Sequence, residues 1–164
     1  MEEIFKNEEF EEDEDRKFSN EIYENIFVRI GRFSIDQRDH NSACVVIDNI
    51  EKTGIKACEE GFKWAAIRAA ISLSTIGNMS IRERLEGLAK QAVLRLYGIG
   101  DAAIRNELQN AIFIIKSLVV VKNYAHKNGF EDIGSAEMWL EELRKIAKEK
   151  ENRNLVKFLD KLKT

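Results

Sequence analysis

The sequence predicts an all-α protein whose helices repeat every 23 residues. Four glycines lie 23 positions apart: Gly31, Gly54, Gly77 and Gly100. Apolar residues follow each glycine at steps of three and four, which keeps them on one face of a helix across the whole unit. We therefore expect one helix of about five turns in each repeat, roughly 28 Å long, and about seven helices in the chain.

The predicted helix ends rest on residues outside the apolar stripe. A glycine just past a helix adopts the left-handed conformation at little steric cost, so each repeat glycine is interpreted as a turn. Ser34 and Ser80 each precede a Gln or Glu by three positions, which is the spacing of a capping box. Ser135 is expected to cap a later helix.

The chain divides into an acidic tail, a repeat region and a C-terminal part. Residues 1–18 are expected to be a disordered tail, and residues 19–164 to be one helical-repeat domain. A helix is expected at about 20–30, before the first glycine. The predicted repeats are 31–53, 54–76, 77–99 and 100–128. Residues 135–163 break the period and are expected to form capping helices.

Two other arrangements also fit the pattern. Gly61 and Gly87 fall in the middle of their units, so each unit would divide there into a short and a long helix. A closed bundle of six or seven helices is the other alternative.

Short loops make neighbouring helices antiparallel, so two units form a hairpin of 46 residues, the size of a HEAT or armadillo unit. Ile30, Ile76 and Ile99 precede three of the four glycines. With this Ile-Gly turn and this period, the chain resembles a short HEAT-like α-solenoid over about residues 20–128. The resemblance implies a right-handed α-α superhelix, although the chain departs from most HEAT units in containing no proline.

The units are also similar to short Ile-Gly-ending helical repeats in cytosolic parts of archaeal membrane proteins. That likeness implies a regulatory cytosolic domain.

Composition favours a soluble, cytoplasmic protein. Apolar residues make up 44% of the chain and charged residues 34%. The most apolar run, 111–121, is much shorter than the ~20 residues needed to span a bilayer. It predicts a buried helix or one that faces a second copy. The acidic N-terminus lacks the features of a signal peptide, and Cys44 and Cys58 have no metal or disulfide spacing.

Charge is concentrated at the N-terminus. Residues 1–16 contain nine acids against Lys6 and Arg16, a net charge of −7, while the whole chain carries −3. Such a segment buries too little apolar surface to order itself, although Ile4, Phe5 and Phe10 are available for docking. A solvated end is the simplest interpretation, and the alternatives are a cover over a basic groove or a linker.

No motif indicates catalysis, so we predict a non-enzymatic protein that requires no cofactor and no metal. His40 and His126 have no His or Cys three or four positions away. HEAT-like di-iron hydroxylases use His-Glu pairs, which this chain lacks. Gly98-Ile-Gly100 is interpreted as a helix end and not as a phosphate-binding loop.

The expected function is a protein interaction or scaffold module. The candidate interaction surface consists of Trp64, Arg68, Arg82 and Arg105. Its expected partner is an unidentified protein or a second copy, with a dimer through residues 111–121. The alternative is nucleic-acid binding of the kind seen in HEAT-like DNA repair glycosylases, which hold DNA in a basic groove.

Overall fold

The computed structural model describes residues 26–131 and 133–162 of the chain. This part folds into seven helices and contains no strand, which confirms the predicted all-α class and number of helices. The helices are α2 (Val28–Asp36), α3 (His40–Glu59), α4 (Lys63–Arg82), α5 (Glu86–Arg105), α6 (Ala111–Lys127), α7 (Ala136–Glu149) and α8 (Arg153–Lys161). The predicted tail and most of the predicted helix at 20–30 lie outside the described residues.

The 23-residue period corresponds to one helix and one short turn. α3, α4 and α5 contain 20 residues each and begin at His40, Lys63 and Glu86. Each is one uninterrupted helix, so the alternative with two helices in each unit is wrong for these repeats. α6 begins at Ala111, two positions later than the period requires, because its connection to α5 is longer.

The repeat glycines lie inside helices, so their assignment as turns was wrong. They are placed in four successive helices: Gly31 in α2, Gly54 in α3, Gly77 in α4 and Gly100 in α5. A Cβ built on Gly54 would lie 2.6 Å from Cδ1 of Ile99, and one on Gly31 would lie 2.8 Å from Cδ1 of Ile76. These glycines therefore allow a helix to approach the next helix but one.

Each of these four helices ends five positions after its glycine, and the residue seven positions after the glycine adopts positive φ. Residues with positive φ stand there at the same 23-residue spacing: Arg38 (55°), Gly61 (79°), Arg84 (58°) and Glu107 (55°). The amide of the following residue donates to a carbonyl five positions earlier, as in Phe62 N to Ala57 O at 2.8 Å. This is a Schellman turn. The predicted repeat boundaries are consequently nine positions out of phase with the helices.

The predicted serine caps are also corrected. Ser34 and Ser80 are buried within α2 and α4, and the Ser80 hydroxyl donates to the Ile76 carbonyl at 2.9 Å. Ser135 does occupy the N-cap position of α7, but its side chain makes no capping hydrogen bond. The Asp39 side chain instead caps α3 by accepting from the Ser42 amide at 3.1 Å.

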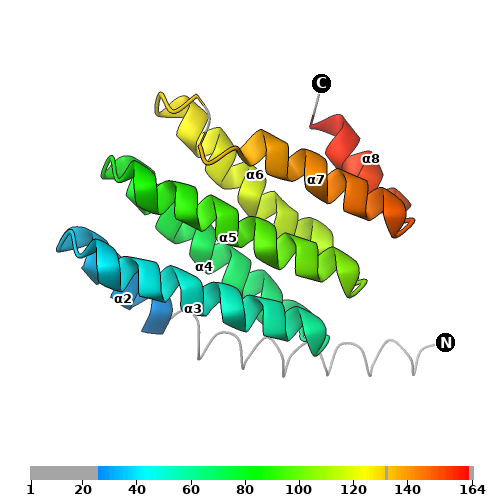
Figure 1. Ribbon diagram of the computed structural model, residues 1–164, viewed down its shortest axis with the longest axis horizontal. Coiled ribbons are helices and arrows are strands. Elements are labelled where there is room, and N and C mark those ends of the chain that lie inside the picture. Colours follow the sequence, from blue (N-terminus) through cyan, green and yellow to red (C-terminus); the bar gives the residue numbers. More distant parts are fainter. Residues whose placement is uncertain (1–25, 132, 163–164) are drawn as a thin grey trace, which may run out of the picture.

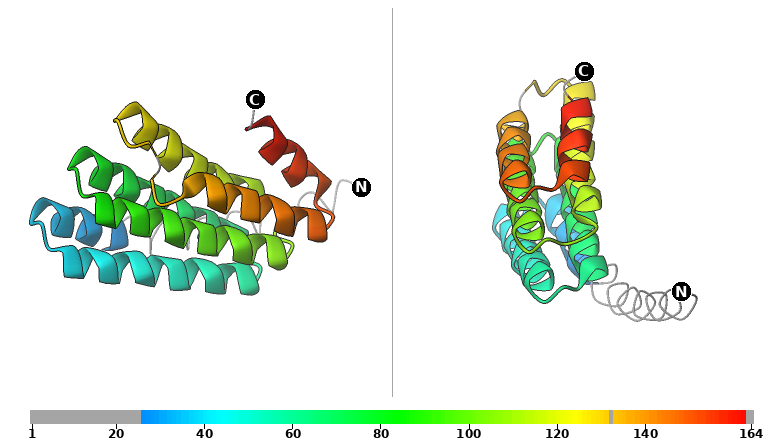
Figure 2. Two further views of the ribbon diagram at one scale, coloured as in Figure 1. Left: turned by 45° about the horizontal axis from the view of Figure 1, so that its top comes forward. Right: turned by 90° about the vertical axis from the view of Figure 1, so that its right-hand side faces the viewer.

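The helices pack as two layers that alternate along the chain. Each helix from α2 to α6 contacts both the next helix and the next but one, and α8 packs on α6 and α7. One layer holds α3, α5 and α7, and the other holds α2, α4, α6 and α8 (Figures 1 and 2). The core lies between the layers, where Ile47, Leu73 and Leu96 are almost completely inaccessible to solvent.

No helix in the described part of the chain has both the length and the apolar composition needed to cross a membrane.

Candidate functional site

Charged residues are divided unevenly between the two layers. α4 and α6 each contain three Lys or Arg and no acid, and α2 contains two arginines and one acid. By contrast, α3, α5 and α7 together contain nine acids and eight Lys or Arg. The layer of α2, α4 and α6 therefore carries the positive charge of the helical region.

α4 is buried except for one narrow stripe. Thirteen of its 20 residues are buried. After Lys63, the accessible residues follow steps of four and three along one face: Trp64, Arg68, Ile71, Thr75, Asn78 and Arg82. Ile71, at 43% exposure, is the most accessible apolar side chain of the stripe.

α6 presents a matching stripe. Its members are exposed and follow the same steps: Phe113, Lys116, Val120, Asn123 and Lys127. Phe113 is 49% exposed and Val120 is 51% exposed. The ammonium of Lys116 lies 5.0 Å from the ring centroid of Phe113 and 5.8 Å from that of Phe158 on α8. Because α6 contains no acid, the Lys116 ammonium interacts with these two aromatic rings.

The two stripes lie level with each other on neighbouring helices. Gly77 of α4 faces Val121 of α6, which stands 44 positions later. A shift of 45 positions carries every α4 stripe residue from Arg68 to Arg82 onto one of α6. Arg29, Ile30, Arg32 and Phe33 are exposed on α2, which packs against α4. We call these three sets of residues together the basic face.

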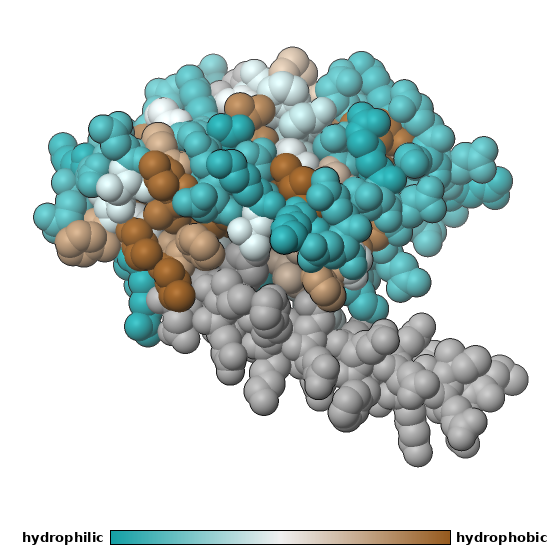
Figure 3. Space-filling model, turned by 60° about the horizontal axis from the view of Figure 1, so that its bottom comes forward, coloured by the Kyte–Doolittle hydropathy of each residue, from teal (hydrophilic) through white to brown (hydrophobic). Residues whose placement is uncertain are grey.

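The N-terminal end of the stack adds apolar surface to this face. Phe33 of α2 is 66% exposed and Ile30 is 46% exposed. Figure 3 shows apolar side chains gathered on the side of the molecule where α2 lies, beside a largely hydrophilic surface. Cationic and apolar groups are therefore interleaved across the basic face.

The structure brings together three of the four residues of the candidate interaction surface. Trp64, Arg68 and Arg82 all lie on the α4 stripe. Arg105 lies near the end of α5, in the other layer, where its Nε is 2.8 Å from Oδ1 of Asp101. Arg82 and Arg105 share an offset in the repeat, but successive helices belong to opposite layers, so an equal offset separates them.

Sequence reasoning missed the contribution of α6. The run 111–121 was interpreted as one apolar segment, and most of its side chains, such as Ile114 and Leu118, are buried inside the chain. Two signals identify its exposed face. Phe113, Lys116 and Val120 follow helical spacing among the buried residues, and no acid occurs between Leu108 and Asn128.

Charges in the other layer neutralise one another. Arg95 of α5 pairs with two acids of α3, with Nη2 3.0 Å from Asp48 Oδ1 and Nη1 3.3 Å from Glu51 Oε2. Gln91 donates to Asp48 at 3.2 Å. Burial raises the pKa of the Glu51 carboxyl, and the Arg95 guanidinium opposes this in part. This cluster links α3 to α5.

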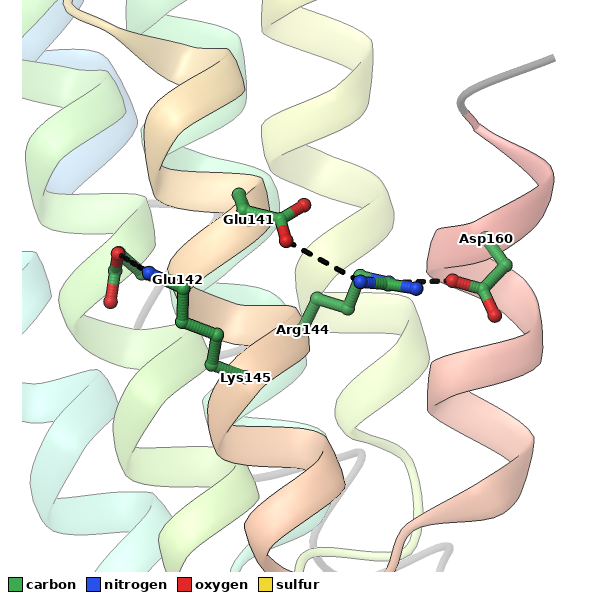
Figure 4. Close-up of polar contacts among 5 residues, drawn as sticks. All are labelled: Glu141, Glu142, Arg144, Lys145 and Asp160. Atoms are coloured by element: carbon green, nitrogen blue, oxygen red, sulfur yellow. Dashed lines mark hydrogen bonds and ion pairs between the residues drawn. The ribbon is translucent and has the colours of Figure 1, made fainter.

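A cavity of about 410 Å³ lies between α6, α7 and α8. Its charged lining is paired: Lys122 Nζ lies 3.0 Å from Glu137 Oε1, and Arg144 bonds Asp160 and Glu141. Figure 4 shows Arg144 reaching from α7 to Asp160 on α8, with Glu141 on its other side. These pairs hold the last helix in place and leave the cavity with compensated charges.

The cysteine and histidine side chains form no reactive cluster in the described residues. Burial raises the pKa of the Cys58 thiol to about 12, which keeps it protonated at neutral pH. His40 begins α3, and His126 stands in the last turn of α6. No group of three or more His, Cys, Asp or Glu in this part of the chain is placed to hold a metal ion.

Comparison of the chain with protein-family models, curated proteins and solved structures found no match.

Proposed function

We propose that this chain is a HEAT-like α-solenoid that acts as a non-enzymatic protein interaction module, and that its basic face binds an acidic segment of a partner protein. Helices that alternate between two layers at a constant interval support the solenoid. Such stacks expose a long face for their length, and partners bind along it. A regulatory or scaffold role follows from this activity.

The observation that carries the proposal is a face on which cations and apolar groups alternate without acids. Eight Lys or Arg stand on α2, α4 and α6 against one acid, Asp36. A surface of one charge steers an oppositely charged partner toward it and disfavours partners of like charge. Charge therefore selects an acidic segment.

The apolar side chains favour a protein segment over other anions. Ile71, Phe113 and Val120 are each between 43% and 51% exposed. Covering such groups gains about 25 cal/mol for each Å² removed from water, which an amphipathic segment with acids and apolar residues achieves. Nucleic-acid interfaces are more polar and rely on phosphate contacts.

The test is affinity capture from nuclease-treated lysate with three full-length chains. The first is wild type, and the second reverses three charges of the basic face (Arg68→Glu, Lys116→Glu, Lys127→Glu). The third reverses three exposed lysines of α3 and α7 (Lys52→Glu, Lys56→Glu, Lys148→Glu). A partner retained by wild type and by the third chain but lost from the second supports the proposal. Equal retention by all three refutes the assignment of the face.

Nucleic-acid binding is the second candidate, because the acid-free stripes of α4 and α6 also suit phosphates. Fluorescence anisotropy with a labelled DNA duplex tests it at about 50 and 200 mM salt. Phosphate contacts make log affinity fall linearly with log salt, with a slope set by the number of contacts. An absent response at the lower salt rejects this candidate, whereas tight, face-dependent binding would replace the protein-segment proposal.

A further inference from the structure

The chain contains both an acidic segment and a surface that lacks acids. Residues 1–16 carry nine acids and two bases. The helices of the basic face carry eight bases and one acid. The formal net charges of the segment and of these helices are opposite, −7 and +7, so the two attract each other.

Four cations of the basic face form no ion pair within the described part of the chain, whereas Arg82 pairs with Glu83 at 3.0 Å. Arg29, Arg32 and Lys127 are exposed and form no ion pair there, and Lys116 contacts only aromatic rings. In the other layer, Lys90 lies 2.6 Å from Glu86 and Lys145 lies 2.6 Å from Glu142, whereas Lys52 and Lys148 form no ion pair with a described residue. Unpaired cations are therefore more frequent on the basic face than in the other layer.

The length of the connection permits contact within one chain. Residues 17–25 join the acidic segment to α2, and nine extended residues span about 30 Å. α2 packs on α4, and α4 packs on α6. Packed helix axes stand about 8–10 Å apart, so both stripes lie within reach.

The acidic segment also carries apolar groups. Ile4 and Phe5 are adjacent in the sequence, and Phe10 lies within a run of acids. The opposing stripes alternate in the same way, with Ile71 between Arg68 and Arg82 on α4. The segment therefore has the chemistry that the basic face is proposed to recognise.

We propose that residues 1–16 bind the basic face of their own chain and compete with the partner for it. This inference rests on the proposed function, because it assigns an internal competitor to the same surface. A tethered segment acts at an effective concentration of about 1 mM. If its separate affinity is about 0.1 mM, it weakens the binding of an outside segment about tenfold.

The test uses a fluorescein-labelled peptide of residues 1–16 and two full-length chains. One is wild type. The other neutralises the segment at seven positions, with Gln for Glu8, Glu9, Glu11, Glu12 and Glu14 and Asn for Asp13 and Asp15. The peptide should bind the neutralised chain about tenfold more tightly than wild type. Equal affinity for both chains overturns the competition and leaves the proposed function standing. Failure to bind either chain overturns both proposals.

A second measurement locates the contact in wild type. Carbodiimide joins carboxylates to lysines that form ion pairs with them, and mass spectrometry identifies the joined peptides. We expect links from residues 1–16 to Lys63, Lys116 and Lys127, and few to Lys52, Lys56 and Lys148 in the other layer. An even distribution overturns the proposal. In a mixture of ¹⁵N-labelled and unlabelled chains, links between isotopes identify a second copy as the occupant and also overturn it.

Discussion

Among the four repeat glycines, Gly54 makes the tightest contact between alternate helices. A side chain there would meet Cδ1 of Ile99 at 2.6 Å and Cβ of Ala69 at 2.9 Å. Isoleucine is able to change rotamer, but the Ala69 Cβ is fixed to the backbone of α4. The Ile76–Gly77 pair thus has two roles: Ile76 fills the space beside Gly31, and Gly77 leaves space for Val121. The pair is a packing motif of the helix interior.

We predict opposite effects of alanine at two helical glycines. Gly54→Ala should lower the free energy of unfolding by about 1–3 kcal/mol, because the added methyl overlaps rigid neighbours. Gly87→Ala should raise it by about 0.5 kcal/mol, since no atom outside the adjacent part of its own helix lies within 4 Å of the new Cβ and alanine favours helix. Urea denaturation measures both. A destabilising effect at Gly87 as large as that at Gly54 would show that crowding is not the cause.

The pH dependence of stability should change when Glu51 is replaced. Because burial raises the folded pKa of Glu51 above its usual value, the native state holds this proton more tightly than the unfolded chain. Ionisation therefore costs the native state stability as pH rises from about 4 toward 7. The stability of Glu51→Gln relative to wild type should increase over this range in urea titrations. Glu149→Gln, at an exposed position of α7, is the control. If the difference in stability between Glu51→Gln and wild type does not change with pH, the prediction is wrong.

At the scale of the element, the helices share one way of ending. Arg38, Gly61, Arg84 and Glu107 adopt positive φ at equivalent positions, and only one of them is glycine. Three non-glycine residues therefore adopt a left-handed backbone conformation that costs roughly 1–2 kcal/mol. The turn is held by the bonds that close each helix and by the packing of the helices on either side.

We predict that glycine stabilises these turns. Arg38→Gly should raise the free energy of unfolding by about 1 kcal/mol, because the exposed Arg38 side chain makes no hydrogen bond or ion pair with a described residue that would be lost. Gly61→Ala should lower it by about the same amount. Thermal denaturation compares both with wild type. If Arg38→Gly is destabilising, the flexibility that glycine adds to the unfolded chain outweighs the relief of strain.

At the scale of the molecule, two features follow from alternation between layers. Burial is greatest in the middle of the stack, where α4 has neighbours on both sides of its layer as well as the facing layer. Charge is segregated, because every second helix faces the same side. α4 and α6 contain no acid and pack against each other. Their accessible stripes therefore form one continuous face.

We predict a gradient of local stability along the stack. Native-state hydrogen exchange should be slowest in α4 and fastest in α8, because α8 packs on α6 and α7 at one end of the stack. The exchange of α8 should become faster still in Asp160→Asn, which weakens the bond to Arg144. Uniform protection across the helices would indicate a single cooperative unit and contradict this gradient.

Part of the candidate site was visible in the sequence. Trp64, Arg68 and Arg82 were selected by residue type, and all three lie on one stripe of α4. Arg105 was selected by the same criterion and lies in the other layer. Phe113, Lys116 and Val120 were overlooked, because an apolar run that is mostly buried hides the minority of side chains that face outward.

The helical class, the 23-residue interval and the number of helices in the described part of the chain could all be predicted from the amino-acid sequence. These follow from the spacing of apolar residues, which is a local property of a chain that buries one face of each helix. The phase of the repeat was decided only by the tertiary structure. A glycine serves equally well as a helix stop and as a point of close approach, and only the presence of Ile99 beside Gly54 distinguishes the two. The basic face was decided in the same way, because residues 45 positions apart become neighbours only when alternate helices pack side by side.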